Sequence, residues 1–544
     1  MPEYLAPGVY IEELNTGPVP IEGVSTSTTG FVGQTERGPV QPTLVTSFVE
    51  YQRWFGSFLA PSISYLPFAA KGFFDNGGQR LFIARVVGAG AQQAKRDLGG
   101  NLTLSAIGEG DWGNRIFARV IASTLGAPDS FRLTLLYYQT LPPLPFVDPT
   151  KQQNLADPNV RANIRDPSAI EDYDNLRTDP NSQDYVVSVI KSASQLVTIQ
   201  DQDLTAPLSV PTLAAPATTG PDGGFVRFAD GSPGTDPAFN EYVGFTAPGP
   251  RTPDNVNDRR GLAGLEAIND ISLLCVPDEV IHTEITDEIV NQCHRLRNRF
   301  AIVHYNTTQH GHEGNVNTIR PPRDTSYAAI YHPWIRVLNP ATLDYPLIPC
   351  GGHVAGIYAA TDVNRGVHKA PANVEVAGIV TRDIDSQRKP LEFLLTKGQH
   401  DILNPRGINV IRDFRPDGRG IRVWGARTMS TDTQWKYINV RRLFIFVEQS
   451  IDRGTQWVVF EPNDEPTWAR VRRSITNFLG TVWRNGALMG ATQEEAFFVK
   501  CDRTTMTQDD IDNGRLICYI GIAPVKPAEF VIFRISQKTI EAAQ

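Results

Sequence analysis

Ile271-Ser272-Leu273-Leu274-Cys275-Val276 and Phe300-Ala301-Ile302-Val303-His304 are two short apolar runs on either side of a helical pattern. The apolar residues between them recur every three or four positions, on one face of a helix that starts near Thr283: Ile285, Ile289, Cys293 and Leu296. A strand, a helix and a second strand in this order predict a parallel strand pair with a right-handed crossover. We therefore expect an α/β (α+β) core.

The same alternation occurs near the start of the chain. Gly30-Phe31-Val32-Gly33 predicts a short buried strand, and the apolar run Leu81 to Val87 predicts a strand covered on both faces. Ser47 and Glu50 have capping-box spacing, and a second helix is expected over Leu66 to Asp75. Continuity with the later stretch predicts one discontinuous core domain.

Between these stretches the amino-acid composition changes. A polar stretch rich in Pro and Asp leads to Asp184, Tyr185 to Ile199 holds β-branched residues around a turn, and 206–258 is again loose. This composition is typical of surface loops on a mainly β module. The domains we expect are a core in two parts, 21–94 and 261–525, an inserted outward-facing domain, 95–260, a linking arm, 1–20, and a linking strand, 526–544.

Both ends of the chain contain β-prone residues. Four prolines punctuate the first twenty residues around Val9, Tyr10 and Ile11, which indicates an extended arm that needs a partner edge. At the other end the residues are apolar on both strand faces: Phe530, Val531, Ile532, Phe533 and Ile535. This segment is either an edge strand of its own sheet or a strand added to a neighbouring subunit.

A basic helix is expected over 467–489. Asp464 suits its N-cap and Pro466 its first turn. No Asp or Glu occurs from Thr467 to Met489, although the chain is acidic overall. One face of the helix is apolar and another is polar, with Arg470, Arg473, Asn477 and Arg484. The polar face is either simply solvated or docks onto an acidic surface, where its charges orient a partner.

Three further elements are expected in the second half of the chain. Pro390 suits the first turn of a helix carrying Leu391, Leu394 and Leu395. The apolar residues from Val440 to Ile451 predict another helix, and Trp457 to Phe460 predict a short strand.

Composition and motifs argue against several functions. A net charge of −8 over 544 residues gives no support for nucleic-acid binding, and no apolar run is long enough for a membrane helix. The five cysteines lack CxxC spacing, which argues against a disulfide framework and a zinc site. His310-Gly311-His312-Glu313 lacks the second His of a zinc motif, and neither a phosphate loop nor GxSxG occurs. We expect no catalytic residues, cofactor or metal.

Several strings across the chain together resemble the contractile tail sheath proteins of phages, R-type pyocins and extracellular contractile injection systems. The matching strings are Tyr4 to Glu13, Ala329 to Trp334, Gly352 to Tyr358, Gly366 to Asn373, Leu403 to Asn409, Val423 to Thr428 and Pro524 to Phe530.

The resemblance implies a helical homo-oligomer around an inner tube, with baseplate and tail terminator proteins as further partners. It also implies terminal arms that add strands to neighbouring subunits, contraction by nearly rigid subunits, and assembly in the cytoplasm of the producing bacterium, followed by a place in a phage tail or in a released or anchored particle. In this context Arg470, Arg473, Asn477 and Arg484 would face the inner tube. The alternatives are another helical structural component or an α/β enzyme with an unrecognised site.

Overall fold

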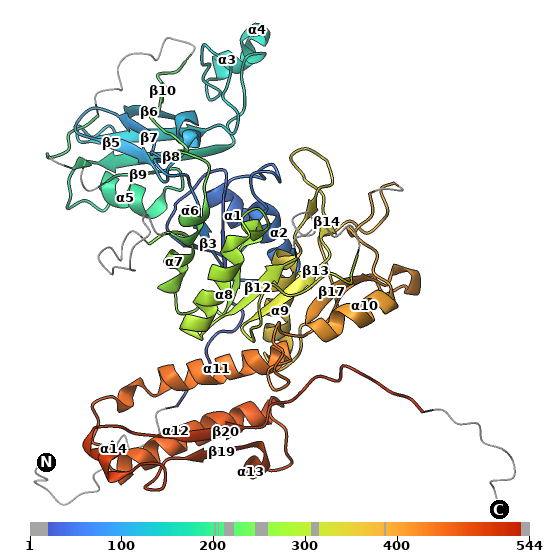
Figure 1. Ribbon diagram of the computed structural model, residues 1–544. Coiled ribbons are helices and arrows are strands. Elements are labelled where there is room, and N and C mark those ends of the chain that lie inside the picture. Colours follow the sequence, from blue (N-terminus) through green and yellow to red (C-terminus); the bar gives the residue numbers. More distant parts are fainter. Residues whose placement is uncertain are drawn as a thin grey trace, which may run out of the picture. The chain divides into compact units, whose positions relative to one another are not determined.

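A nine-stranded sheet organises most of the chain (Figure 1), in the order β16-β18-β17-β13-β12-β11-β1-β3-β2. The computed structural model describes residues 20–200, 203–204, 206–211, 222–244, 259–305, 315–385 and 388–534. The strands of this sheet are β1 (Thr29–Gly33), β2 (Thr43–Val45), β3 (Leu81–Arg85), β11 (Leu273–Cys275), β12 (Phe300–His304), β13 (Ala328–His332), β16 (Val374–Glu375), β17 (Ile408–Asp413) and β18 (Ile421–Trp424).

The pairing of β1 joins two distant parts of the sequence. β1 pairs in parallel with β3 on one side and with β11 on the other. β11, β12, β13 and β17 continue the parallel sheet, whereas β2, β18 and β16 pair antiparallel at its margins. The predicted α/β fold class and the parallel pairing of the two opening runs are confirmed, and strands from before and after the 95–260 stretch share one sheet.

The helices between these strands bury apolar faces. α2 (Leu66–Asp75) coincides with the predicted helix, and α1 (Phe48–Phe55) begins where the Ser47 side chain accepts a hydrogen bond from the Glu50 backbone N–H. The other helices and 3₁₀ turns among the described residues of this part are α7 (Gly261–Glu266), η5 (Pro277–Val280), α8 (Glu284–Leu296), α9 (Gly351–Arg365), α10 (Lys397–Leu403), η6 (Asn404–Arg406) and η7 (Arg415–Asp417). β14 (Ile335–Arg336) and β15 (Leu347–Ile348) form a separate pair.

The stretch from 95 to 244 has two small sheets and a core of its own. One sheet contains β4 (Lys95–Asp97), β5 (Thr103–Ala106) and β9 (Val197–Thr198), and the other β10 (Val226–Arg227), β6 (Ile116–Ala122), β7 (Ser130–Tyr137) and β8 (Ala169–Arg177). Its helices and 3₁₀ turn are η1 (Asp111–Arg115), α3 (Gln152–Ala156), α4 (Pro158–Arg161), α5 (Val186–Ala193) and α6 (Phe239–Val243).

The mainly β character predicted for this stretch does not extend to all of Tyr185 to Ile199. The β-branched residues directly after Tyr185 form the helix α5, and a strand, β9, forms only at Val197–Thr198. Val186, Val187 and Ile190 lie on one helical face and pack into the core of the stretch, so tertiary burial outweighs the β propensity of valine and isoleucine.

The chain divides into two compact units. The larger unit comprises Thr26–Asn364 and Pro371–Ile438, and the C-terminal unit comprises Met1–Ser25, Arg365–Ala370 and Asn439–Gln544. The C-terminal unit contains α11 (Ile438–Gly454, whose first residue belongs to the larger unit), η8 (Gln456–Val458), α12 (Glu465–Arg484), α13 (Gln493–Ala496), β19 (Phe497–Lys500), α14 (Gln508–Asp512) and β20 (Tyr519–Ile522). The division near 438 falls inside the stretch that the sequence places in one core domain, 261–525.

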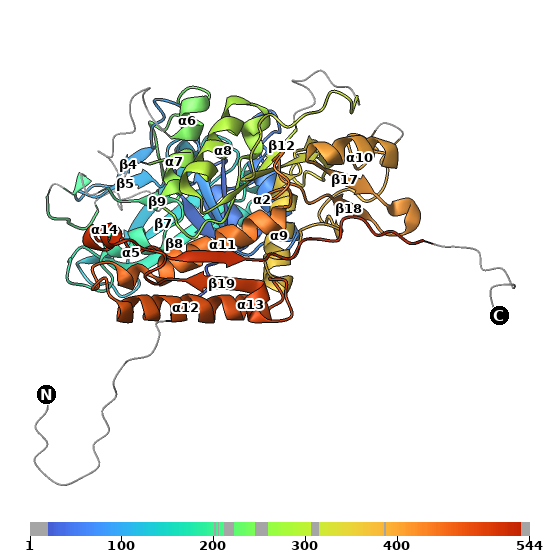
Figure 2. The same cartoon turned by 60° about the horizontal axis from the view of Figure 1, so that its bottom comes forward.

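The basic helix α12 differs in extent from the prediction of 467–489. It begins after Asp464, whose carboxylate accepts from the Thr467 N–H, and ends before Gly486, whose positive φ of 79° turns the chain. The apolar face of α12 packs against α11 and β19 in a core that includes Leu443, Val471, Ile475, Phe478, Leu479, Val482 and Phe497. Figure 2 shows α12 alongside β19.

Two short elements were also predicted wrongly. The run Trp457 to Phe460 is not a strand, because η8 occupies its start and Phe460 has a left-handed φ of 69°. No helix follows Pro390, whose carbonyl accepts a hydrogen bond from the Arg336 N–H, and Leu391 forms a β-bridge with Ile335.

Candidate assembly surfaces

The four predicted tube-facing residues form one stripe along α12. At about 100° per residue, Arg470, Arg473, Asn477 and Arg484 fall within an arc of roughly 60°. All four side chains are exposed, and the opposite face of the helix is buried. We call these four residues the α12 stripe.

The arginines of the stripe are held to different degrees. The Arg470 guanidinium lies 3.0 Å from the Glu461 carboxylate and 5.1 Å above the Trp457 ring, so it is anchored from outside the helix. Arg484 donates to its own helix, at the Gly480 carbonyl and the Thr481 hydroxyl, both at 3.1 Å. Arg473 has no ion pair among the described residues. The stripe therefore presents one fixed cation and others that are available to a partner.

The hairpin β19–β20 is a sheet of only two strands. Phe497 pairs with Ile522 and Lys500 with Tyr519, in antiparallel register. Within the part of the chain that the structure describes, no third strand joins this sheet. Phe498 and Tyr519 are more than half exposed on it. An open edge with exposed aromatic side chains is a surface to which an extended segment can add.

The segment after β20 leaves the unit as an exposed apolar chain. Three backbone hydrogen bonds hold its start: Met489 N–H to the Ala523 carbonyl (2.8 Å), Ala523 N–H to the Ala496 carbonyl (2.8 Å) and Val525 N–H to the Ala487 carbonyl (3.2 Å). Beyond them, 526–534 contains no strand, and the side chains of Phe530, Val531, Ile532 and Phe533 are 69–82% exposed. The described part of the tail is thus not an edge strand of its own sheet. Ile535 lies outside the described residues, as do Val9, Tyr10 and Ile11 of the N-terminal arm.

Three of the strings that carry the family resemblance meet at Asn409 in the larger unit. The Asn409 amide donates to the carbonyls of Ile330 and Arg427, at 3.2 and 2.8 Å, and accepts from the Arg427 N–H. A Cβ on Gly425 would come within 3.0 Å of the Asn409 backbone. In this way Asn409 joins β13, β17 and the chain that follows β18.

Helix α9 packs against α2 through glycines. A Cβ on Gly352 would lie 2.4 Å from the backbone of Ala69, and one on Gly356 would lie 2.3 Å from the Phe73 carbonyl. His353, between them, is fully buried, and burial lowers its pKa to about 3, so the ring stays neutral. This histidine is part of the packing between the two helices.

The carboxyl ends of β1 and β11, where open α/β sheets commonly hold ligands, are filled by side chains. The Asp278 carboxylate accepts from the Ser64 hydroxyl and the Tyr65 N–H at 2.7 Å, and from the Tyr242 hydroxyl at 3.0 Å. Burial raises the pKa of Asp278 to about 6. Beside it, Glu279 accepts from His304 Nδ1 at 2.7 Å. These buried groups satisfy one another.

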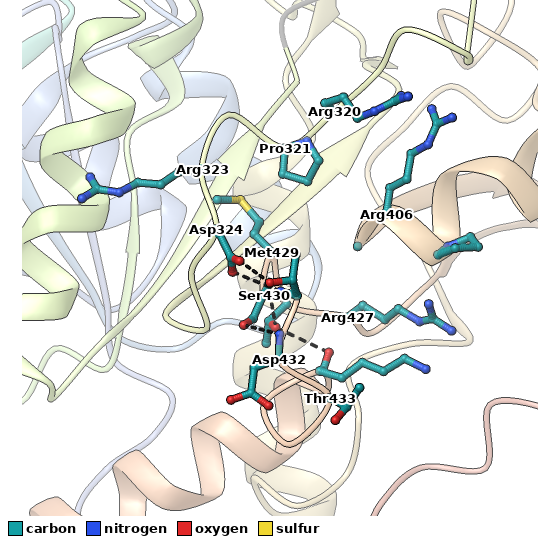
Figure 3. A pocket seen from close by; sticks show the side chains of 15 residues that line it. Arg320, Pro321, Arg323, Asp324, Arg406, Arg427, Met429, Ser430, Asp432 and Thr433 are labelled. Atoms are coloured by element: carbon teal, nitrogen blue, oxygen red, sulfur yellow. Dashed lines mark hydrogen bonds between the residues drawn. The ribbon is translucent and has the colours of Figure 1, made fainter.

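A more open pocket of about 560 Å³ lies between the loop at 320–324 and the segment 427–436 (Figure 3). Arg320 and Arg406 both donate to the carbonyls of Asn317 and Ile319. Partial burial and the charge of Arg320 lower the pKa of Arg406. The Asp324 carboxylate accepts hydrogen bonds from Thr431, and these lower the pKa of the carboxyl. The pocket offers cationic donors and an ionised structural carboxylate.

Among the described residues, no three His, Cys, Asp or Glu side chains are grouped as metal ligands would be, and no helix is long and apolar enough to cross a membrane. The segment His310 to Glu313 lies outside the described residues.

Two family models match the chain. The phage tail sheath protein central domain matches residues 256–429, and the phage tail sheath C-terminal domain matches residues 430–538. Together they span more than half of the 544 residues. This chain belongs to the phage tail sheath family. The predicted family is confirmed, and the second match contains the α12 stripe, the hairpin and the described part of the tail.

Relatives and solved structures agree with this assignment. A major tail sheath protein of a Pseudomonas aeruginosa prophage is 27% identical over 37% of this chain and 49% of its own length, and the tail sheath protein of phage T4 is 24% identical over 34% and 26%. The chain thus spans about half or less of these relatives.

Among solved structures, the contracted helical sheath of the anti-feeding prophage superposes with a TM-score of 0.55 at 23% identity, covering 98% of this chain and 100% of that one. The contracted sheath complex of the extracellular injection system PVC gives 0.52 at 22% identity, covering both chains fully. The sheath-family chain shares their fold.

Proposed function

We propose that this chain is a structural, non-enzymatic subunit of a contractile sheath, which polymerises helically around an inner tube and contracts to drive the tube through a target envelope. The observation that carries the proposal is the family match over 256–538, which includes every described assembly surface. Baseplate and terminator proteins would bind the ends of the polymer, and assembly would take place in the cytoplasm of the producing bacterium.

The hairpin and the tail support linkage between identical copies. The tail is apolar and unpaired, and the hairpin has open edges with exposed aromatic side chains. A tail that adds to the hairpin of the next copy joins two different surfaces, and a head-to-tail contact of this kind generates a helix when its rotation does not close into a ring. The N-terminal arm, 1–20, would add a further strand.

The α12 stripe supports a second, weaker kind of contact. Exposed charges contribute little each, because water screens them, and such contacts can be made and released. Contact of the stripe with the inner tube would therefore hold the extended state reversibly, while the strand contacts keep the subunits joined during contraction.

Negative-stain microscopy of the overexpressed chain tests the proposal. We expect hollow, ridged cylinders. Deletion of 1–20, or replacement of Phe530, Val531, Ile532 and Phe533 with serine, should leave folded subunits that do not polymerise. Serine at the polar positions Lys526 and Arg534 serves as the matched control. A monodisperse monomer from the unaltered chain, or normal cylinders from both altered chains, would contradict the proposal.

A further inference from the structure

Two cysteines lie opposite each other at the end of the hairpin. Cys501 directly follows β19 and Cys518 directly precedes β20. Since Lys500 pairs with Tyr519, the next residues in register are Cys501 and Cys518. Their side chains are hydrogen-bonded to each other, although both thiols are free.

The hydrogen-bond pattern of the hairpin shows whether Cys501 and Cys518 form a hydrogen-bonded or a non-hydrogen-bonded pair of the antiparallel ladder. The Ala523 N–H donates to the carbonyl of Ala496, its directly opposite residue. Hydrogen-bonded and non-hydrogen-bonded pairs alternate along an antiparallel ladder, so counting from 496 places Cys501 and Cys518 in a non-hydrogen-bonded pair. In such pairs the Cα atoms lie about 4.5 Å apart, within the range of roughly 4.4–6.8 Å that a disulfide spans. The backbone therefore already has the separation that the bond requires.

The surroundings favour reaction at this pair over the other thiols. Cys275, Cys293 and Cys350 are fully buried, and burial raises the pKa of each. By contrast, the hydrogen bond from Cys518 lowers the pKa of Cys501, with help from the charge of Arg472, while the pKa of Cys518 is raised by the same bond.

Access to the pair is uneven. Cys501 is buried beside Trp468 and Met506, whereas Cys518 is partly exposed. An incoming reagent therefore meets Cys518, with Cys501 directly behind it.

We propose that Cys501 and Cys518 are a disulfide-forming site, oxidised by a low-molecular-weight disulfide such as oxidised glutathione. The Cys518 thiol, which is the sulfur that the reagent reaches, passes its proton to the Cys501 thiolate and attacks the reagent, forming a mixed disulfide and releasing one small thiolate. The Cys501 thiol then loses its proton and attacks Cys518, which releases the second small thiolate. Two protein thiols lose two electrons and two protons, and the reagent is reduced to two thiols.

The bond would fix the strand register of the hairpin. It closes the loop from 501 to 518, which contains α14. Closing a loop of this length constrains the unfolded chain, so the thermal midpoint of the C-terminal unit should rise by on the order of 10 °C.

Thiol counting and peptide mapping of the full chain test the site. After equilibration with oxidised glutathione we expect one intramolecular Cys501–Cys518 bond and three remaining thiols. Cys501→Ser should stop at the mixed disulfide on Cys518, Cys518→Ser should leave Cys501 unmodified, and the control Cys293→Ser should still form the bond. Five free thiols in the oxidised wild type, or a bond between other cysteines, would overturn the proposal. Thiol counting and peptide mapping can be done on soluble and on polymerised chains. A failure to form the disulfide can therefore be distinguished from a failure to form a sheath.

Discussion

Reversing the charges of the α12 stripe tests the proposed contact with the inner tube separately from folding. In the triple variant Arg470→Glu, Arg473→Glu, Arg484→Glu, each substitution changes the charge by two, so the stripe changes by six. The variant should fail to form extended particles around the inner tube, while tube-free polymers still form.

The folding cost of this variant can be worked from the described contacts. Arg470 loses an exposed ion pair, at about 0.2–1 kcal/mol, and a contact over Trp457, at about 0.5–1 kcal/mol. Arg484 loses a favourable place in the last helical turn, at about 0.3–1 kcal/mol. The total is roughly 1–3 kcal/mol, and the C-terminal unit should remain folded. Against a tube, six units of charge at roughly 1 kcal/mol per close pair amount to several kcal/mol for each subunit.

A matched control exists on other faces of the same unit. Arg472→Glu, Lys500→Glu, Arg503→Glu makes the same change of six charges. It also loses comparable contacts, because Arg503 pairs with Glu465 at 2.9 Å and lies 5.9 Å from the Trp468 ring. The assay is co-expression with the inner tube, counts of extended particles by negative stain, and circular dichroism of each variant. Normal numbers of extended particles from the stripe variant would refute the assignment of the stripe, as would equal loss in both variants.

Two further substitutions test the larger unit by denaturant unfolding. Burial raises the pKa of Asp278 to about 6, so the folded state retains a proton that the unfolded chain has lost, and ionisation disfavours folding as the pH rises through about 6. Wild type should lose roughly 2 kcal/mol of unfolding free energy relative to Asp278→Asn between about pH 4.5 and 7.5. If the difference in unfolding free energy between the two proteins is the same at both pH values, the Asp278 carboxyl titrates normally and the prediction is wrong. Gly352→Ala should cost about 1–3 kcal/mol or more, because its Cβ meets the Ala69 backbone, whereas Gly398→Ala, with open space around its Cβ, should be neutral or slightly stabilising.

The elements that sequence predicted well are those in which local signals and burial agree. β12 and α2 coincide with their predicted ranges, because an apolar run is fully buried in one and a helical apolar pattern is buried in the other. The residues after Tyr185 show the opposite case, since their β propensity is overridden by packing. The division near 438 coincides with the first residue of α11, and the start of a helix does not by itself indicate the boundary of a unit.

Some features of the candidate surfaces could be predicted from the sequence, and others could not. The polar face of α12 follows from helical periodicity, so its four residues could be named in advance. The contacts of Arg470 with Glu461 and Trp457 could not, since both partners precede the helix and reach it only through the turn at Phe460. The juxtaposition of Cys501 and Cys518 depends on the register of a hairpin whose connection includes α14, and residue spacing alone gives no register.

The root of the tail also has a mechanical consequence. Val525 is fastened twice, since its N–H donates to the Ala487 carbonyl and its carbonyl accepts from the Asn439 amide at 3.1 Å. Asn439 lies at the start of α11, and its amide also donates to the His368 carbonyl. A pull on 526–534 would therefore load several bonds at once, spread over three separate segments of the unit. Tension on the tail would therefore be shared with α11 and with the segment at His368 before it reached β20.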